Sequence, residues 1–117
     1  MHSNLTSYDI GIFSEFIAGI YLRLHGFKIL HRRYITGKNT GRAEIDIIAK
    51  RKNLIVFVEV KRRKNLVTGL EAVTLTQKNR LRQAAETYLA QKRWKGDARF
   101  DIVVVMPHKI QWIKSAI

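Results

Sequence analysis

Three charged side chains stand inside two strand-like apolar runs of this sequence. Asp46 lies in the run of residues 44–48, and Glu59 and Lys61 lie at the end of the run that begins at Leu54. A buried strand rarely carries an ionised side chain, because desolvating a charge without a partner or a metal is very costly. A metal-dependent site that hydrolyses phosphodiester bonds would account for all three charges.

The spacing of these residues predicts how they meet. Strand side chains alternate between the two faces of a sheet, so Glu59 shares a face with Lys61, and Glu44 shares one with Asp46. A two-residue turn at residues 52–53, whose Asn tolerates the left-handed conformation, sets Asp46 opposite Glu59 and Glu44 opposite Lys61. A divalent cation between the facing carboxylates would turn their repulsion into attraction. A turn longer by one residue would instead put the carboxylates on opposite faces.

Composition predicts one globular domain, residues 1–117. The 117 residues are 46% hydrophobic, which is enough for a single core, and they include no Cys for disulfides or a thiolate zinc site. No apolar run approaches the roughly 18 residues of a membrane span. The polar N-terminus lacks the basic and apolar regions of a signal peptide. We therefore expect a cytoplasmic protein that has no membrane partner.

The charge balance predicts a polyanionic partner. The net charge is +13, from 22 Lys and Arg against 9 Asp and Glu, and such an excess is typical of proteins that bind nucleic acid. A merely soluble basic protein is the alternative. An anionic membrane surface fits less well, because no predicted helix sets a basic face against a wholly apolar one. Several of the few acids fall in or near the proposed site, namely Glu15, Glu44, Asp46 and Glu59.

Hydrophobic periodicity predicts an α/β protein with the element order α-β-β-β-α-β-β. We expect a mixed central sheet of about five strands, flanked by helices, with the run after Asn53 as a central strand covered on both sides. Residues 36–42 are expected to form a mobile polar loop. The predicted helices are residues 6–25 and 76–92, and the predicted strands are residues 27–35, the two arms of the hairpin, 100–106 and the edge strand 110–113.

These features resemble the core of the PD-(D/E)XK nuclease superfamily, with Ile45 where the Pro of that name would stand. More closely, the chain resembles the YraN-like family of bacterial predicted endonucleases, whose relatives include archaeal Holliday-junction resolvases. The match covers almost the whole chain, including Glu15, residues 44–49 and residues 57–61. In Gln77-Lys78 the chain reverses the family's usual Lys-Gln order. The resemblance implies a restriction-endonuclease-like fold, cleavage of DNA that includes branched or damaged forms, and a homodimer.

The expected cofactor is Mg²⁺ or Mn²⁺, because both prefer oxygen ligands such as carboxylates. Asp46 and Glu59 are the expected direct ligands, and the resemblance adds the carbonyl of Val60. Lys61 is expected to orient the attacking water or to stabilise the charge that develops on the phosphate. The alternatives are a structural ion pair for the two carboxylates and simple charge compensation for Lys61.

Other polar and aromatic residues have weaker assignments. By resemblance Glu15 completes the metal site, although a solvated helix glutamate is the alternative. Glu44 is expected to support the site as a partner of Lys61 or a nearby Arg rather than as a ligand. Asp101 lies in an apolar strand and is expected to hold a basic residue in place, and the two Trp side chains are expected to pack in the core or at an interface.

Two functions from different classes remain open at this point. The first is a metal-dependent endonuclease acting on DNA, and the second is a nucleic-acid-binding module of the same fold that acts through a partner. The intact carboxylates and Lys61 favour the endonuclease, because a pure binder gains nothing from carboxylates that face phosphate. In either case basic residues position the backbone phosphates with little sequence preference. The candidates are Lys38, Arg42, Arg62, Arg63, Lys64, Lys78, Arg80 and Arg82, each of which has solvated surface as its alternative.

Overall fold

The computed structural model describes residues 6–37, 41–65 and 74–117 of the chain. The predicted loop at residues 36–42 therefore lies partly outside the described residues. The elements follow the predicted order α-β-β-β-α-β-β. They are α1 (Ser7–Leu24), β1 (Lys28–Thr36), β2 (Ala43–Arg51), β3 (Leu54–Arg62), α3 (Leu75–Lys92), β4 (Asp97–Val105) and β5 (Ile110–Ile113).

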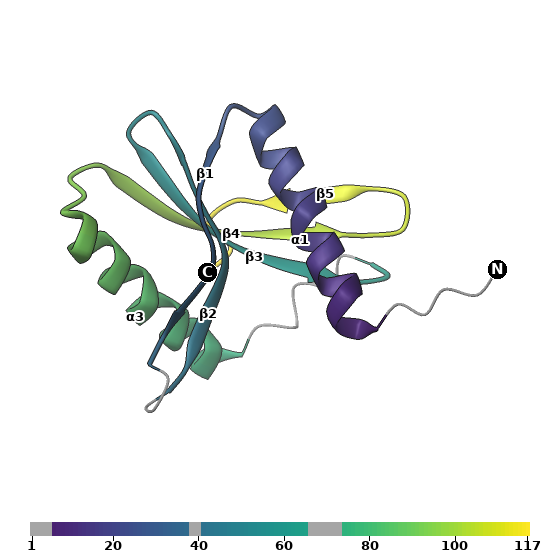
Figure 1. The fold of residues 1–117 in the computed structure, drawn as a ribbon, viewed down its shortest axis with the longest axis horizontal. Helices are drawn as coiled ribbons and strands as arrows, with labels where there is room; N and C mark the ends of the chain where they lie inside the picture. The colour runs from purple at the N-terminus through teal and green to yellow at the C-terminus, as the bar shows by residue number, and fades with distance from the viewer. Residues whose placement is uncertain (1–5, 38–40, 66–73) are drawn as a thin grey trace.

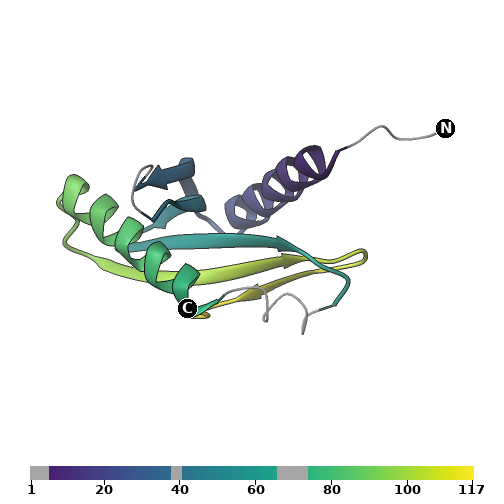
Figure 2. The same ribbon diagram turned by 90° about the horizontal axis from the view of Figure 1, so that it is seen from below.

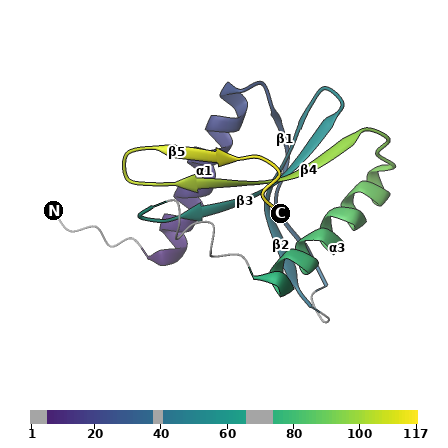
Figure 3. The ribbon, with the colours of Figure 1, turned by 180° about the vertical axis from the view of Figure 1, so that it is seen from behind.

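The strands form one mixed sheet in the order β1-β2-β3-β4-β5 (Figure 1). Neighbouring strands pair antiparallel except β3 and β4, which are parallel. A parallel pair needs a crossover connection, and α3 lies on that connection. β3 is central, as predicted, and β5 is an edge strand beside β4 (Figure 3).

The two helices cover opposite faces of β3. On one face Ala18 and Leu22 of α1 pack with Val56 and Val58, and Figure 2 shows the α1 ribbon on that side of β3. On the other face the predicted apolar stripe of α3 packs with Ile55 and Phe57 of β3 and comprises Leu81, Ala84, Ala85, Tyr88 and Leu89. Both sides of the strand are therefore buried, which explains its almost continuous run of apolar residues.

Capping residues fix where both helices begin. In α1 the Thr6 side chain accepts a hydrogen bond from the backbone of Asp9, whose side chain accepts one from the Thr6 backbone. In α3 the side chain of Thr74 caps the first turn, so this helix begins one residue before the predicted position 76. Gly26 directly follows the C-cap of α1 with φ +85°, which a glycine adopts without steric cost.

One predicted strand boundary and one predicted detail of the hairpin turn need correction. β4 begins at Asp97 rather than at residue 100, because the backbone of residues 97–99 continues the parallel pairing with β3. The predicted hairpin turn at residues 52–53 is confirmed, since Arg51 pairs with Leu54. The left-handed residue of that turn is Lys52 (φ 54°) and not the Asn.

The role expected for Asp101 is confirmed. Its carboxylate is fully buried in β4 and accepts two hydrogen bonds from the guanidinium of Arg99, at 2.8 and 2.9 Å. It also accepts from the indole of Trp112 at 2.7 Å and from the backbone of Ser115 at 3.0 Å. These contacts tie the chain after β5 back to the middle of the sheet. The packing role of the Trp residues is also confirmed, because Trp112 packs against the core on the α1 side of the sheet and Trp94 against the core on the α3 side.

We expect Asp101→Asn to lower the free energy of unfolding by about 2 kcal/mol, because an amide nitrogen would face the buried donors that the carboxylate now accepts. Urea unfolding followed by circular dichroism measures the loss. Asp97→Asn is the control, because Asp97 is exposed at the start of the same strand. Equal effects of the two substitutions would contradict the structural role of Asp101.

Within the described residues, no helix is long and apolar enough to cross a membrane.

Candidate active site at the fork between β2 and β3

The central feature of the site is a fork in the sheet. Pairing between β2 and β3 follows the predicted register from Arg51–Leu54 as far as Ile47–Val58 and then ends. Beyond this point β2 stays paired with β1, β3 stays paired with β4, and the two pairs run apart (Figure 1). Asp46 and Glu59 are the first residues past the last rung, so they occupy the inner corner of the fork.

The β1–β2 ribbon changes face at the same place. Ile47 packs on the α1 side of the sheet, whereas Ile45 packs on the α3 side. Residues two apart on a regular strand share a face, so the alternation is broken at Asp46. Arg33 lies opposite Asp46 and has a left-handed backbone with φ 54°. Glu44 and Asp46 were expected to share a face because side chains alternate along a regular strand. β2 does not keep this alternation at Asp46, but both residues still line one pocket.

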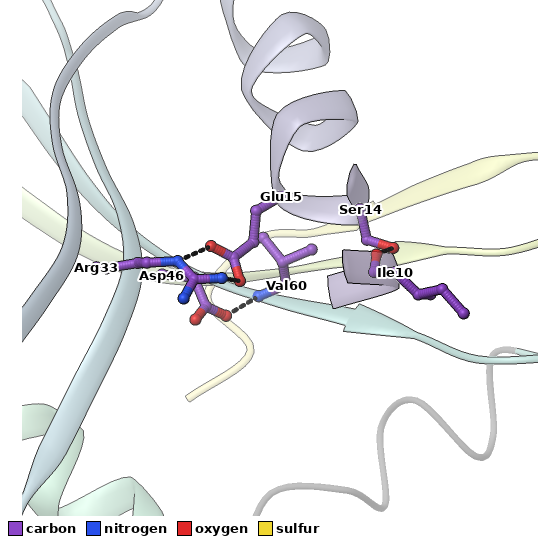
Figure 4. A network of polar contacts seen from close by, with 6 residues as sticks. All are labelled: Ile10, Ser14, Glu15, Arg33, Asp46 and Val60. Atoms are coloured by element: carbon purple, nitrogen blue, oxygen red, sulfur yellow. Dashed lines mark hydrogen bonds and ion pairs between the residues drawn. The ribbon is translucent and has the colours of Figure 1, made fainter. Parts of the chain in front are cut away.

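Asp46 bridges the opening of the fork. Its carboxylate accepts a hydrogen bond of 2.8 Å from the backbone N–H of Val60, which β2 no longer satisfies by strand pairing (Figure 4). This contact holds Asp46 beside Glu59, although the predicted ladder pair is not formed. The separation of the strands leaves room around the two carboxyl groups that a continuous ladder would fill.

Glu59 is the most perturbed titratable group of the site. It is only 5% exposed. Burial, the charge of Asp46 and a contact between the two carboxyl groups raise the pKa of Glu59 to about 9, while Lys61 acts in the opposite direction. The amide of Gln77 on α3 donates to Glu59 at 3.0 Å, and the amine of Lys61 lies 3.8 Å away. Lys61 therefore pairs with Glu59, whereas the sequence predicted that Glu44 would pair with Lys61 or a nearby Arg.

Glu15 reaches the same region from α1. The guanidinium of Arg33 donates to both of its carboxylate oxygens, each at 3.1 Å (Figure 4). Burial and the charge of Asp46 raise the pKa of Glu15, and Arg33 opposes this effect. An arginine thus enters the acidic cluster, but on the side of Glu15 and not between Asp46 and Glu59.

These residues line one pocket of about 520 Å³ that lies between α1, the fork and α3. The acidic side chains of Glu15, Glu44, Asp46 and Glu59 all reach it, together with Val60 and Lys61. The predicted basic residues Arg42, Arg62 and Arg80 also line it. The pocket therefore combines a carboxylate cluster with cationic walls, an arrangement that attracts a cation and a phosphate together.

Not all predicted phosphate-binding residues are at the pocket. Arg82 lines a separate hollow with Phe57 and Leu89. The side chain of Lys64 is exposed, and Arg63 donates to the carbonyl oxygen of Arg62 at 2.8 Å. Lys78 lies on α3 outside the pocket lining, and Lys38 lies outside the described residues.

The donor set fits a hard divalent cation, although the described residues form no preformed metal cage. Within the described part of the chain, no group of three or more His, Cys, Asp or Glu side chains has the geometry to hold a metal ion. Glu15 is instead turned toward Arg33. Asp46 and Glu59 do lie together. Burial and the charge of Asp46 raise the pKa of Glu59, and a cation between the two carboxyl groups would oppose both effects.

Sequence reasoning missed two residues of the site. Gln77 contacts Glu59, but its reversed order with Lys78 left its role open. Arg33 contacts Glu15, and nothing in the sequence distinguishes it from Arg32 beside it. Both contacts join residues 18 positions apart, from different elements.

The fold and pocket define an α/β protein with an acidic cluster at a fork in its sheet, and comparison with known sequences gives its family. The profile described as "Uncharacterised protein family UPF0102" matches residues 14–105. A UPF0102 protein of Paramagnetospirillum magneticum is 36% identical over 102 residues, which cover 86% of this chain and 79% of that protein. One of Rhizobium leguminosarum is 38% identical, with 86% and 80% covered, and one of Agrobacterium fabrum is 39% identical, with 83% and 78% covered.

The chain therefore belongs to the UPF0102 family, which is the YraN family that the sequence resembled.

Proposed function

We propose that this protein is a metal-dependent endonuclease that hydrolyses phosphodiester bonds in DNA. The observation that carries the proposal is the meeting of Asp46, Glu59 and Lys61 in one pocket that has arginines in its walls. Two carboxylates held against each other at the bottom of a cationic pocket are costly in any protein. They are useful where a cation and a phosphate must bind side by side. A cytoplasmic location and a homodimer are parts of the same proposal.

Each residue has a task in this proposal. Asp46 and Glu59 hold Mg²⁺ or Mn²⁺, with the carbonyl of Val60 as a further ligand and Glu15 as the ligand that completes the set. The bound metal supplies a water of lowered pKa and a polarised phosphate. Lys61 stabilises the negative charge that develops on the phosphate oxygens. Glu44 adds negative charge beside the ligands, since it raises the pKa of Glu15 and of Glu59.

The proposal is tested by incubating the protein with linear, nicked and four-way DNA in the presence of Mg²⁺ or Mn²⁺. We expect cleavage that is lost in Asp46→Asn, a variant that keeps the acceptor for the Val60 N–H and so preserves the fork. Lys95→Ala is the control, because Lys95 is exposed next to the start of β4, at the opposite end of that strand from the site. Binding of DNA without cleavage by any preparation would instead support the nucleic-acid-binding module.

Two arginines on α3 test whether DNA binds at the pocket. Arg80 lines the pocket, whereas Arg82 lines a different hollow. We expect Arg80→Ala to weaken DNA binding about threefold and to reduce the slope of log K against log salt by about 1, because one phosphate contact is lost. Fluorescence anisotropy at several salt concentrations measures both quantities. Arg82→Ala should change neither, and equal effects of the two variants would mean that their charge acts only from a distance.

A further inference from the structure

Arg33 combines two unusual features at one point of the site. It has a left-handed backbone inside β1, a conformation that non-glycine residues rarely adopt. Its side chain makes a two-bond ion pair with Glu15, which is half-buried at the pocket. Backbone conformations of this kind persist only where the surroundings enforce them, and they gather at functional sites.

The left-handed backbone has a direct consequence for the side chain. The residues before and after Arg33 pair with Ile47 and Ile45, which pack on opposite sides of the sheet. The turn of the ribbon at Arg33 therefore lets its guanidinium point at α1, where Glu15 lies. Figure 4 shows the guanidinium against the Glu15 carboxylate, on the side where Asp46 also lies.

We propose that Arg33 is a positioning residue that occupies Glu15 as a built-in counter-cation and so sets the affinity of the pocket for a divalent metal. This inference rests on the proposed function, because it concerns the same metal site. In the observed state both oxygens of Glu15 are used by Arg33. A metal that takes Glu15 as a ligand must replace this ion pair, and it must also approach a fixed positive charge.

Isothermal titration of the metal-free protein with Mn²⁺ tests the inference without DNA and without turnover. Arg33→Asn is the informative variant, because Asn tolerates the left-handed conformation and cannot pair with a carboxylate as a cation. We expect it to bind Mn²⁺ about three- to tenfold more tightly than the unchanged protein. In a Glu15→Gln background the same substitution should give a clearly smaller gain, because the ligand for which Arg33 competes is gone and only the repulsion between Arg33 and the metal is relieved.

Arg32→Asn is the matched control, since it removes the same charge one residue away. The Arg32 guanidinium packs against Gly19 of α1, where an added Cβ would lie 2.6 Å from it. We expect less than a twofold change in this variant. An Arg33→Asn protein that binds Mn²⁺ as the unchanged protein does, or more weakly, would overturn the inference and leave the nuclease proposal standing. Absence of Mn²⁺ binding in every variant would overturn both.

A second, independent observation concerns the outer face of α1. Large apolar side chains stay exposed along it, among them Phe13 at 61% and Leu24 at 79%. The exposed face, which we term the α1 stripe, consists of Ile12, Phe13, Phe16, Ile20 and Leu24. These positions fall within an arc of about 120° on a helix of 3.6 residues per turn. The exposed side of α3 differs, because it carries mainly polar residues.

The geometry of the α1 stripe points to a second copy of this chain as its partner, an inference that gives the homodimer of the proposed function its interface. Four of the five residues of the stripe are symmetric about position 18, so two antiparallel helices related by a two-fold axis set Phe16 against Ile20 and Ile12 against Leu24. An interface between identical chains requires such self-complementarity. The side chains of the α1 stripe expose on the order of 500 Å² per copy. Pairing would therefore bury about 1,000 Å² in total, which is the lower limit for a specific interface. The exposed Arg23 is the one Lys or Arg of the described part of α1, and it falls within this arc, where the same two-fold axis sets it against Phe13 of the other copy.

Sedimentation equilibrium over a range of protein concentrations tests the pairing. We expect the unchanged protein to dimerise at micromolar concentrations and Phe16→Glu to remain monomeric with an unchanged circular dichroism spectrum. Leu75→Glu is the control, because Leu75 is equally apolar and 73% exposed at the start of α3. A protein that is monomeric throughout, a Phe16→Glu variant that still dimerises, or a monomer that binds anionic vesicles through the stripe would overturn the inference.

Discussion

Lys61→Met is expected to reduce the rate of DNA cleavage by about 10²- to 10³-fold, because Lys61 lies beside the candidate ligand Glu59 and would face the charge that develops on the phosphate. Its amine lies 3.8 Å from Glu59, and its side chain is 16% exposed at the pocket. Single-turnover cleavage with saturating Mg²⁺ measures this effect. DNA binding should change by no more than a few-fold, since many other cations surround the pocket.

Lys61→Arg separates charge from position. Arginine keeps the positive charge, but its planar guanidinium does not place a compact donor at the same point. If Lys61 acts on the reacting phosphate, this variant should also lose most of its activity while binding DNA normally. If Lys61 only balances the charge of Glu59, then Lys61→Arg should be fully active, and cleavage within tenfold of the unchanged protein in Lys61→Met would contradict a direct role.

The central hairpin was predictable from sequence because short-range rules determine it. The turn at residues 52–53 fixes the register of β2 on β3, and the apolar alternation from Leu54 to Val58 fixes which side chains meet each helix. The capping residue Thr6 likewise marks the start of α1. In each case the signal and the structure that it predicts lie within a few residues of each other.

The end of the hairpin was not predictable in the same way. The ladder stops after Ile47–Val58, and the β1–β2 ribbon changes face where Arg33 lies opposite Asp46. A left-handed residue is readable from sequence when it is Gly or Asn, but Arg gives no such signal. The contact of Glu59 with Gln77 depends on how α3 crosses the sheet, which no local pattern records.

The second large effect that we expect concerns Glu59 and the pH dependence of stability. In the folded protein the pKa of Glu59 is about 9, whereas in the unfolded chain it is near the ordinary glutamate pKa of 4.5. Between these values the folded state binds more protons than the unfolded state, so stability falls as pH rises. The favourable contribution of Glu59 to the free energy of unfolding is fully present below about pH 4.5 and is lost as the pH approaches 9.

Glu59→Gln should remove this loss, because a neutral amide can still accept from Gln77 and donate toward Asp46 as a protonated glutamate does. Each pKa unit corresponds to about 1.4 kcal/mol, so the full shift is worth at most about 6 kcal/mol. Allowing for relaxation of the site, we expect the variant to gain roughly 3 kcal/mol over the unchanged protein between pH 5 and pH 9. Urea unfolding in metal-free buffer across this range measures the gain.

Glu86→Gln is the matched control for this measurement. Glu86 is an exposed glutamate on α3, so its replacement should leave the pH dependence of the unchanged protein intact. Parallel stability curves for Glu59→Gln and the unchanged protein would mean that the carboxyl groups at the fork do not hold a proton. In that case Asp46 and Glu59 would already share the pocket as two stable anions, and the need for a cation between them, from which the nuclease proposal starts, would disappear.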